Sequence, residues 1–539
     1  MCGFCFSNQH INDFNIFRET YLDSNIVKRG GDGNNFLQKQ NYFFAHSLFS
    51  VTGNEPSKQP IYDDDHYLLF NGEIYNYKEL SIEHGYKDLS DTELLFSLIK
   101  KLGFKPALEK AFGAYAICYV NFNKGLINLT RDQWGQKPLY YSTEGGITVS
   151  SSFQLIEDIL GKSRKKENLN IFKLFGFSPF GNSINHNIKY VLPGEIVNIN
   201  IKDRYTKSIP FSLKDYNNFV NRDPIKIIKD SFSKTGQEKK TCIAFSGGTD
   251  SSILASINKE IGSDLELLHL KIDENINEYN KAISLSDKLG SNIKVIEYDK
   301  NHISMSSIID HPIDNFGMTA TSNLAKYASS AGYRIILTGF GSDEIFGGYS
   351  RANYFYKLKD ININDSYLKI LKAVFDITKA GALILSIMGI FLKNKFQLVC
   401  LIFLLLRNND SRVYVLRNIF SSLRSLQSID FDDITVSNSD NFLEALSRFE
   451  RLYVMPEVMC LPLDTVGQQH GIEFRSPFLH PDLDKIFTND IKNIYMPYKI
   501  ILKNFLKLKN LYEPSVKERF ASKLSKKSRK ERIEELISN

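Results

Sequence analysis

The stretch TCIAFSGGTDSSILASI (residues 241–257) decides the fold of the second half of the chain. Its apolar start, 241–245, predicts a strand. Residues 246–250 predict a glycine-containing loop, and a helix is expected from about Ser251. Backbone amides of such a loop and helix N-terminus bind phosphate. The loop carries Asp250 and lacks the lysine of the G-x-x-x-x-G-K-[ST] motif. A carboxylate beside phosphates implies a bridging Mg²⁺ and cleavage of ATP between its α- and β-phosphates; the alternative is a serine- and glycine-rich turn without a ligand.

A second stretch of the same kind, RIILTGFGSDEIFGGY (334–349), places Asp343 after another short apolar run. Parallel strands end at one edge of a sheet, so Asp250 and Asp343 are expected to hold one Mg²⁺ there. Downstream, PYKIILKNFL (497–506) carries Lys499 and Lys503 one helical turn apart. One of them could face a departing pyrophosphate; as isolated residues they would be surface charge.

The residue pattern changes near the middle of the chain. Residues 1 to about 205 contain short β-branched or aromatic runs broken by Gly, Asn and Asp, which is typical of two packed sheets. From about 220, apolar strands alternate with helical periods, which predicts a parallel sheet covered by helices, and after about 350 the pattern is nearly all helical.

Composition limits the class of protein. The 539 residues are 42% hydrophobic and 24% charged, as in soluble globular chains, and a net charge of +6 does not suggest a nucleic-acid partner. The six scattered cysteines and the lack of a signal-peptide pattern favour a reduced, cytoplasmic setting. The apolar stretches 380–392 and 396–406 are each too short to span a membrane, so buried helices are expected and membrane contact is the less favoured alternative.

The chain opens MCGFCFS. Removal of Met1 would make Cys2 the N-terminus, with an α-amine beside its own thiol. That amine, with an ordinary pKa of about 7.7–8.0, can act as the base that activates the thiol. The alternative is a structural buried cysteine.

Several motifs together resemble a known family. SGGTDSS, LTGFGSDEIFGGY, GIEFRSPFL and YKxxLK are similar to the synthetase domain of glutamine-hydrolysing asparagine synthetases, and MCGF, KRGGDG, FNGEIYNY, LSDTELL and RDQWGQKPLYY to the glutaminase domain, in the same order. The resemblance implies an α+β N-terminal nucleophile glutaminase domain at 1–205, with two packed antiparallel sheets and helices. An α/β pyrophosphatase-loop synthetase domain at 220–539, with a helical C-terminal part, is expected to follow.

The resemblance also implies residue roles. Cys2 would attack the side-chain amide of glutamine, with the oxyanion held by Asn71 and the backbone amide of Gly72. Glu73 and Asp91 would receive the glutamine amino group, and ammonia would travel inside the protein to the second site. The implied residues there are Ser246, Gly247, Gly248, Asp250, Ser251 and Gly339 for ATP, Asp250 and Asp343 for Mg²⁺, and Lys499 for the phosphates.

Three positions depart from the family pattern. Leu48, in HSLFSV, stands where the family has an arginine for the glutamine carboxylate, and the intact Arg29 occupies a different family position. Phe340 replaces a glutamate that is a candidate base for ammonia. The segment 311–327, with Thr319 roughly aligned, lacks the arginine at the mouth of the acceptor pocket. A pocket without that arginine would hold the α-carboxylate of aspartate poorly, so the acceptor need not be aspartate.

The leading hypothesis is an ATP- and glutamine-dependent ligase that adenylates a carboxylate, for example a sugar uronate, and converts it to an amide. Asparagine synthesis is the alternative within the same class. A scaffold protein with decayed sites and an adenylate-forming ring-closing enzyme are alternatives of other kinds. The expected partners are glutamine and a carboxylate acceptor, with a homodimer as a further option. His46, His470 and Trp134 are interpreted as structural residues.

Overall fold

The computed structural model describes residues 2–8, 13–50, 58–210, 223–236, 240–272, 276–299, 310–313, 318–349, 351–361, 441–489 and 499–512, with a few isolated positions. The buried helices expected at 380–392 and 396–406 lie outside these ranges, apart from Cys400, Leu401 and Leu404, whose side chains are fully buried. In the part of the chain that the structure describes, no helix is long and apolar enough to cross a membrane.

The front half contains two packed antiparallel sheets, as predicted. One has the order β10-β8-β9-β1-β3-β2 and the other β12-β11-β7-β6-β5-β4. The strands are β1 (Gly3–Ser7), β2 (Asn34–Lys39), β3 (Tyr42–Ser47), β4 (Ile61–Tyr62), β5 (His66–Ile74), β6 (Gly113–Asn121), β7 (Leu126–Arg131), β8 (Tyr140–Ser142), β9 (Thr148–Ser150), β10 (Lys189–Tyr190), β11 (Glu195–Asn200) and β12 (Thr206–Pro210).

The core of the front half lies between these sheets and under the helices outside them. Phe6 and Phe44 of the first sheet pack against Tyr67 and Leu69 of the second. Helices α1 (Phe14–Asp23) and α5 (Phe153–Leu160) cover the first sheet, and α3 (Asp91–Leu102) covers the second. The remaining helical elements are η1 (Asn25–Arg29), α2 (Tyr77–His84), α4 (Phe104–Leu108) and α6 (Lys166–Phe175).

The rear half is built on a parallel sheet of order β15-β14-β13-β16-β17, which confirms the predicted α/β class. Its strands are β13 (Thr241–Ala244), β14 (Glu266–Lys271), β15 (Ile293–Glu297), β16 (Ile335–Leu337) and β17 (Glu473–Arg475). The helical elements are α7 (Pro224–Thr235), α8 (Thr249–Glu260), α9 (Ile276–Leu289), α10 (Met318–Ser330), α11 (Ser342–Phe346), α12 (Ala352–Lys357), α18 (Phe442–Phe449), the π-helical segment η4 (Glu450–Cys460), α19 (Leu461–His470), α20 (Pro481–Asn489) and α22 (Ile500–Leu508).

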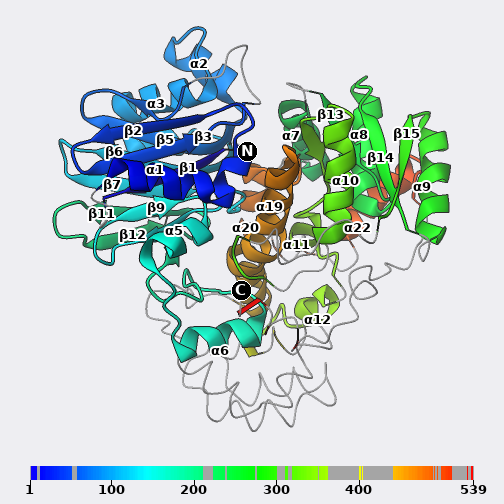
Figure 1. The fold of residues 1–539 in the computed structure, drawn as a ribbon. Coiled ribbons are helices and arrows are strands. Elements are labelled where there is room, and N and C mark those ends of the chain that lie inside the picture. Colours follow the sequence, from blue (N-terminus) through cyan, green and yellow to red (C-terminus); the bar gives the residue numbers. More distant parts are fainter. Residues whose placement is uncertain are drawn as a thin grey trace.

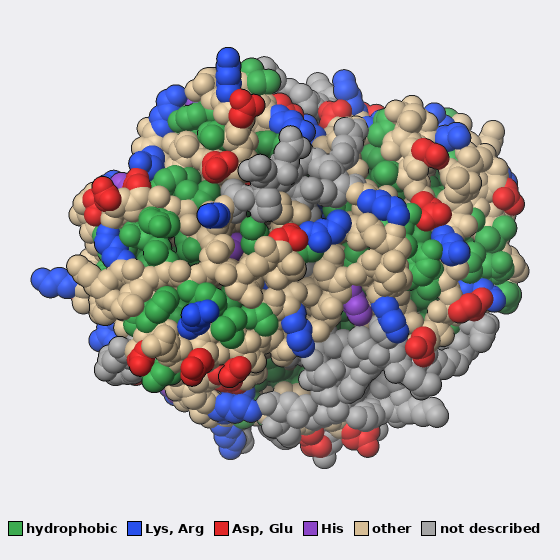
Figure 2. All heavy atoms as spheres, turned by 45° about the horizontal axis from the view of Figure 1, so that its top comes forward, with side chains coloured by type: hydrophobic (Ala, Val, Ile, Leu, Met, Phe, Trp, Pro, Cys, Tyr) green, Lys and Arg blue, Asp and Glu red, His purple; other side chains and the backbone are tan. Residues whose placement is uncertain are grey.

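Helices cover both faces of the parallel sheet. Apolar side chains of α7, α8, α9 and α22 contribute to the core on one face. Side chains of α10 and α19 pack against the other face. Figure 1 shows the two halves side by side, with α19 between them. On the face in Figure 2, basic and acidic side chains are interspersed and form no single-sign patch over the described part.

Candidate active sites

Cys2 lies directly before β1, in a small apolar cluster with Leu48 and Phe49. The thiol is buried and forms two hydrogen bonds with Phe49. The Phe49 N–H donates to Sγ over 3.4 Å, and Sγ donates to the Phe49 carbonyl over 3.6 Å. Burial raises the thiol pKa above its usual value, and the charges of Glu473 and Asp91 add to this rise. A nucleophilic role for Cys2 therefore requires a base.

Asn71 and Gly72 lie on β5 in the interior. Asn71 is fully buried, and both polar atoms of its side-chain amide lack a hydrogen-bond partner among the described residues. Leaving such groups unpaired costs on the order of 1–3 kcal/mol, so this amide is suited to a ligand. Gly72 has φ +150°, and a Cβ there would lie 2.1 Å from the Ala114 carbonyl oxygen. Only glycine fits that position.

The two acids expected to receive the glutamine amino group are already engaged. Asp91 begins α3, and its carboxylate accepts hydrogen bonds from the backbone amides of Ile74 (3.0 Å) and Thr92 (2.8 Å). Glu73 forms an ion pair with Arg475, a residue of the rear half. The sequence motif around Glu73 contains no sign of this partner.

Glu73 and Arg475 end a chain of buried charges that starts beside Cys2. Its members are Arg29, Asp464, Lys137, Glu473, Arg475 and Glu73, and each side chain is at most 3% exposed. The signs alternate along the chain, with separations of 2.5 Å (Arg29–Asp464), 3.8 Å, 3.5 Å and 3.6 Å for the first four links. Arg29 also donates to the Cys2 carbonyl over 3.5 Å. Three members come from each half, so the surroundings of Cys2 include charges of both halves.

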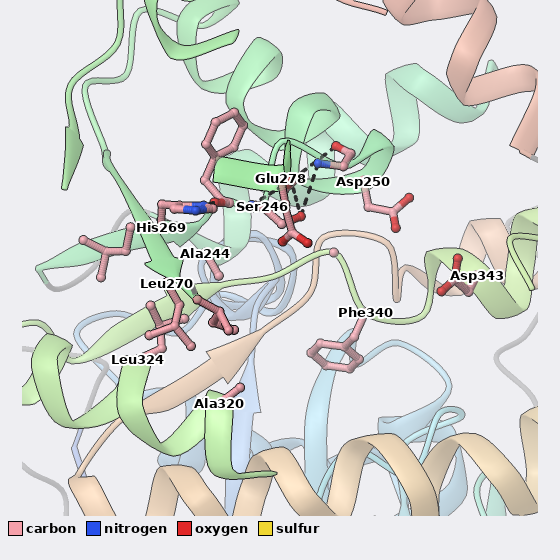
Figure 3. A pocket seen from close by; sticks show the side chains of 16 residues that line it. Ala244, Ser246, Asp250, His269, Leu270, Glu278, Ala320, Leu324, Phe340 and Asp343 are labelled. Atoms are coloured by element: carbon pink, nitrogen blue, oxygen red, sulfur yellow. Dashed lines mark hydrogen bonds between the residues drawn. The ribbon is translucent and has the colours of Figure 1, made fainter. Parts of the chain in front are cut away.

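The rear half has a pocket of about 410 Å³ at the carboxyl ends of its strands (Figure 3). Of the predicted ATP and metal residues, it is lined by Ser246, Gly248, Asp250, Ser251, Gly339 and Asp343, while Gly247 and Lys499 are not on its wall. The Gly248 N–H donates to Ser246 Oγ over 3.2 Å, which helps to shape the loop. Figure 3 shows Asp250 and Asp343 at one end of the pocket and Leu270 and Leu324 at the other.

Lys499 joins the two acids. Its Nζ lies 2.5 Å from Asp250 Oδ1 and 2.5 Å from Asp343 Oδ1. Burial alone would lower the pKa of Lys499, but the two carboxylates outweigh it and raise that pKa. A Cβ at Gly348 would lie 2.1 Å from Lys499 Cε, so glycine there permits this approach. Because both carboxylates reach one cation, they can share one Mg²⁺, with phosphate oxygens or water as further ligands.

The sequence aligns Thr319 roughly with the family arginine at the mouth of the acceptor pocket; the pocket of the rear half is lined by Ala320 and Leu324 of the same helix, α10. Sequence reasoning also missed His269 and Glu278, which line the pocket from β14 and α9. Neither lies in a recognisable motif, so only the fold brings them there. Phe340 lines this pocket and also a second cavity of about 10 Å³ that includes Lys137 and Asp464. Phe340 therefore borders both the pocket and the cavity beside these buried charges.

Comparison with known proteins gives two family matches. Residues 1–209 match a glutamine amidotransferase domain, and residues 229–537 match the family described as asparagine synthase. Asparagine synthetase (glutamine-hydrolyzing) 1 of Bacillus subtilis is 29% identical over 353 residues, which are 61% of this chain and 55% of the relative. The putative asparagine synthetase (glutamine-hydrolyzing) 2 of Methanocaldococcus jannaschii is 28% identical over 338 residues, which are 58% of this chain and 64% of the relative.

The chain thus spans 55–64% of the length of these curated relatives. Among solved structures, glutamine phosphoribosylpyrophosphate amidotransferase of B. subtilis has a TM-score of 0.30 and 14% identity, over 63% of this chain and 81% of its own. A likeness of that size carries no structural argument. The asparagine synthase match covers more than half of the chain, and the protein therefore belongs to the asparagine synthase family.

Proposed function

We propose that this chain is a ligase that forms an amide from a carboxylic acid, with ATP for activation and glutamine as the nitrogen donor. One observation carries the proposal: a single chain holds a buried cysteine, a buried asparagine amide without a partner among the described residues, and a separate pocket lined by two carboxylates that Lys499 contacts. The matches to amidotransferase and asparagine synthase domains support the same pairing. The proposed domains are 1–205 and 220–539.

At the front site, Cys2 would be the nucleophile once Met1 is removed. The α-amine takes the thiol proton, Sγ bonds to the side-chain carbonyl carbon of glutamine, and the C–N bond breaks to release ammonia. Water then hydrolyses the thioester to glutamate. Asn71 Nδ2 and the Gly72 amide would stabilise the oxyanion, while Glu73 and Asp91 would receive the amino group.

At the rear site, Ser246, Gly247, Gly248, Ser251 and Gly339 would bind ATP. Asp250 and Asp343 would hold Mg²⁺, which neutralises charge on the pyrophosphate that leaves. Lys499 would face the phosphates from behind the two acids. The acceptor carboxylate attacks the α-phosphorus, and ammonia then displaces AMP from the acyl-adenylate.

The pocket wall favours an acceptor with one carboxylate. No Lys or Arg is among the described residues that line it, so aspartate would have no cation for its second carboxylate there. A sugar uronate has a single carboxylate and is the proposed class. Asparagine synthesis is the second candidate, since the curated relatives are named for it.

The test is glutamate release and pyrophosphate formation by the purified chain with ATP, Mg²⁺, glutamine and a panel of acids that includes aspartate and uronates. Cys2→Ala should abolish glutamate release. Cys5→Ala, at a fully buried cysteine on β1, the strand that follows Cys2, is the matched control and should retain it. The acid that triggers pyrophosphate identifies the acceptor class; if wild type forms neither product with any acid, the proposal is wrong.

A further inference from the structure

Arg334 of the rear half lies beside the segment that holds the nucleophile. Its guanidinium carbon is 3.9 Å from the centre of the Phe49 ring, and Phe49 is the residue bonded to the Cys2 thiol. Nη2 of Arg334 donates to Asp32 Oδ2 over 2.9 Å and to the Ser50 carbonyl over 3.2 Å. Arg334 therefore contacts the front half at Phe49, which is hydrogen-bonded to Cys2, and at the next residue, Ser50.

Arg29, Arg475 and Arg334 differ in what their guanidinium groups can still bind. Arg29 is buried and uses Nη1 and Nη2 for the Cys2 carbonyl and Asp464. Arg475 is buried too and is engaged by Thr235, Glu73 and Glu473. The side chain of Arg334 is 33% exposed, and both of its hydrogen bonds to described residues use Nη2. Its Nε and Nη1 edge is therefore the one suited to a ligand.

An amide donor such as glutamine brings a carboxylate to this region. Leu48, which directly precedes Phe49, is apolar and buried with Cys2 and Phe49. A carboxylate that leaves water beside such side chains needs a cation, and a guanidinium can bind it with two parallel hydrogen bonds. Arg334 is already held in place by Asp32 and by the Phe49 ring, so it would lose little freedom on binding.

We propose that Arg334 binds the α-carboxylate of the amide donor, so that the donor site is completed by a residue of the rear half. This assignment rests on the proposed glutaminase function. It would also let glutamine bind although Leu48 stands beside the nucleophile.

The test compares two donors, glutamine and 4-aminobutanamide, which is glutamine without its carboxylate. Charge-assisted hydrogen bonds of this kind correspond to roughly a 10- to 100-fold effect. Arg334→Gln should lower kcat/KM for glutamine by about that factor, mainly through KM, and leave kcat/KM for 4-aminobutanamide within about twofold. Leu48→Arg, added to Arg334→Gln, should restore part of the glutamine activity.

Asp32→Asn is the matched control, because it removes the ion pair and keeps the guanidinium. It should change kcat/KM for glutamine much less than Arg334→Gln does. Alkylation of Cys2 by iodoacetamide should proceed at the same rate in wild type and Arg334→Gln. Equal losses with both donors, or no change with glutamine, would overturn the assignment; absence of glutamate release by wild type would instead contradict the proposed function itself.

Discussion

Glu73 of β5 and Arg475 of β17 form an ion pair between the two halves, and their side chains are 3% and 0% exposed. Removal of one partner from such a pair leaves an uncompensated buried charge, which typically costs about 3–5 kcal/mol. Arg475→Met should therefore lower the free energy of unfolding by that order, as measured by chemical denaturation. The double variant Glu73→Gln/Arg475→Met should lose less than the sum of the two single variants.

An exposed ion pair between the halves provides the control. Lys234 and Glu79 lie 2.8 Å apart, with side chains 34% and 55% exposed. Exposed pairs contribute about 0–1 kcal/mol, so Lys234→Met should change stability little. If Lys234→Met and Arg475→Met lowered the free energy of unfolding by similar amounts, burial would not be the reason that the Glu73–Arg475 pair contributes to stability.

The steric need for glycine at position 72 can be tested by comparison with a glycine whose surroundings have room for a Cβ. Gly72→Ala would push a Cβ to 2.1 Å from the Ala114 carbonyl oxygen on the paired strand β6, so β5 and β6 must separate. We expect a loss of about 3 kcal/mol or more in unfolding free energy, with reduced yield of folded protein. Gly85→Ala has φ +76° but nothing within 4 Å, and should cost only about 1 kcal/mol. Equal losses would contradict the steric argument.

The strand, loop and helix at 241–257 could be predicted because a short apolar run indicates a strand and glycines indicate a loop from the neighbouring residues alone. The structure places β13 at Thr241–Ala244 and begins α8 at Thr249, close to the expected Ser251. Trp134 is packed and 2% exposed, and His46 Nε2 is 3.1 Å from the Phe70 carbonyl, as expected for structural residues. Local sequence patterns therefore predicted the sheets and the loops that carry the candidate site residues.

The buried charges could not be predicted in this way. Lys137 and Glu473 look like surface residues in the sequence, yet they are 3% and 2% exposed and lie 3.5 Å apart. Their pairing joins positions more than 300 residues apart along the chain, and no spacing rule reports on such contacts. Arg334 and Asp32 are likewise paired although they lie 302 residues apart in the sequence. Lys499 was placed on a helix face, but it precedes α22 in a left-handed conformation with φ 55°.

Glu344, next to Asp343, makes stability depend on pH. Burial and the charge of Asp343 raise the pKa of Glu344 from 4.5 to about 7, although the Tyr349 hydroxyl donates to it over 2.5 Å. Between these two values the folded state keeps a proton that the unfolded state has lost. Stability from this group is therefore complete below about pH 4.5 and is lost as the pH rises through about 7.

Glu344→Gln should remove that dependence, because an amide does not titrate and can still accept the Tyr349 hydrogen bond. Urea unfolding of wild type and variant at about pH 5 and about pH 7.5 measures the difference, with a slope of up to about 1.4 kcal/mol per pH unit for one proton. The variant should gain relative stability at the higher pH. A constant difference between the two proteins would show that Glu344 titrates normally.

Phe340 lines both the pocket of about 410 Å³ and the small cavity beside Lys137 and Asp464. If ammonia passes between the proposed sites through this region, the phenyl ring obstructs it. Phe340→Ala should join the two spaces and raise the amount of amide formed per glutamate released. The ratio of pyrophosphate to glutamate, measured with the acceptor that the acid panel identifies, tests this expectation.

Phe346→Ala is the matched control for loss of a phenyl group. Phe346 is fully buried six residues further along and lines neither cavity. Each Phe-to-Ala change in a core costs about 3–5 kcal/mol, so stability alone would affect Phe346→Ala at least as much as the half-buried Phe340. A higher ratio only in Phe340→Ala would assign the effect to the partition between the cavities. An unchanged or lower ratio would mean that the ring does not limit transfer, because opening the space beside it would then bring no more ammonia to the acyl-adenylate.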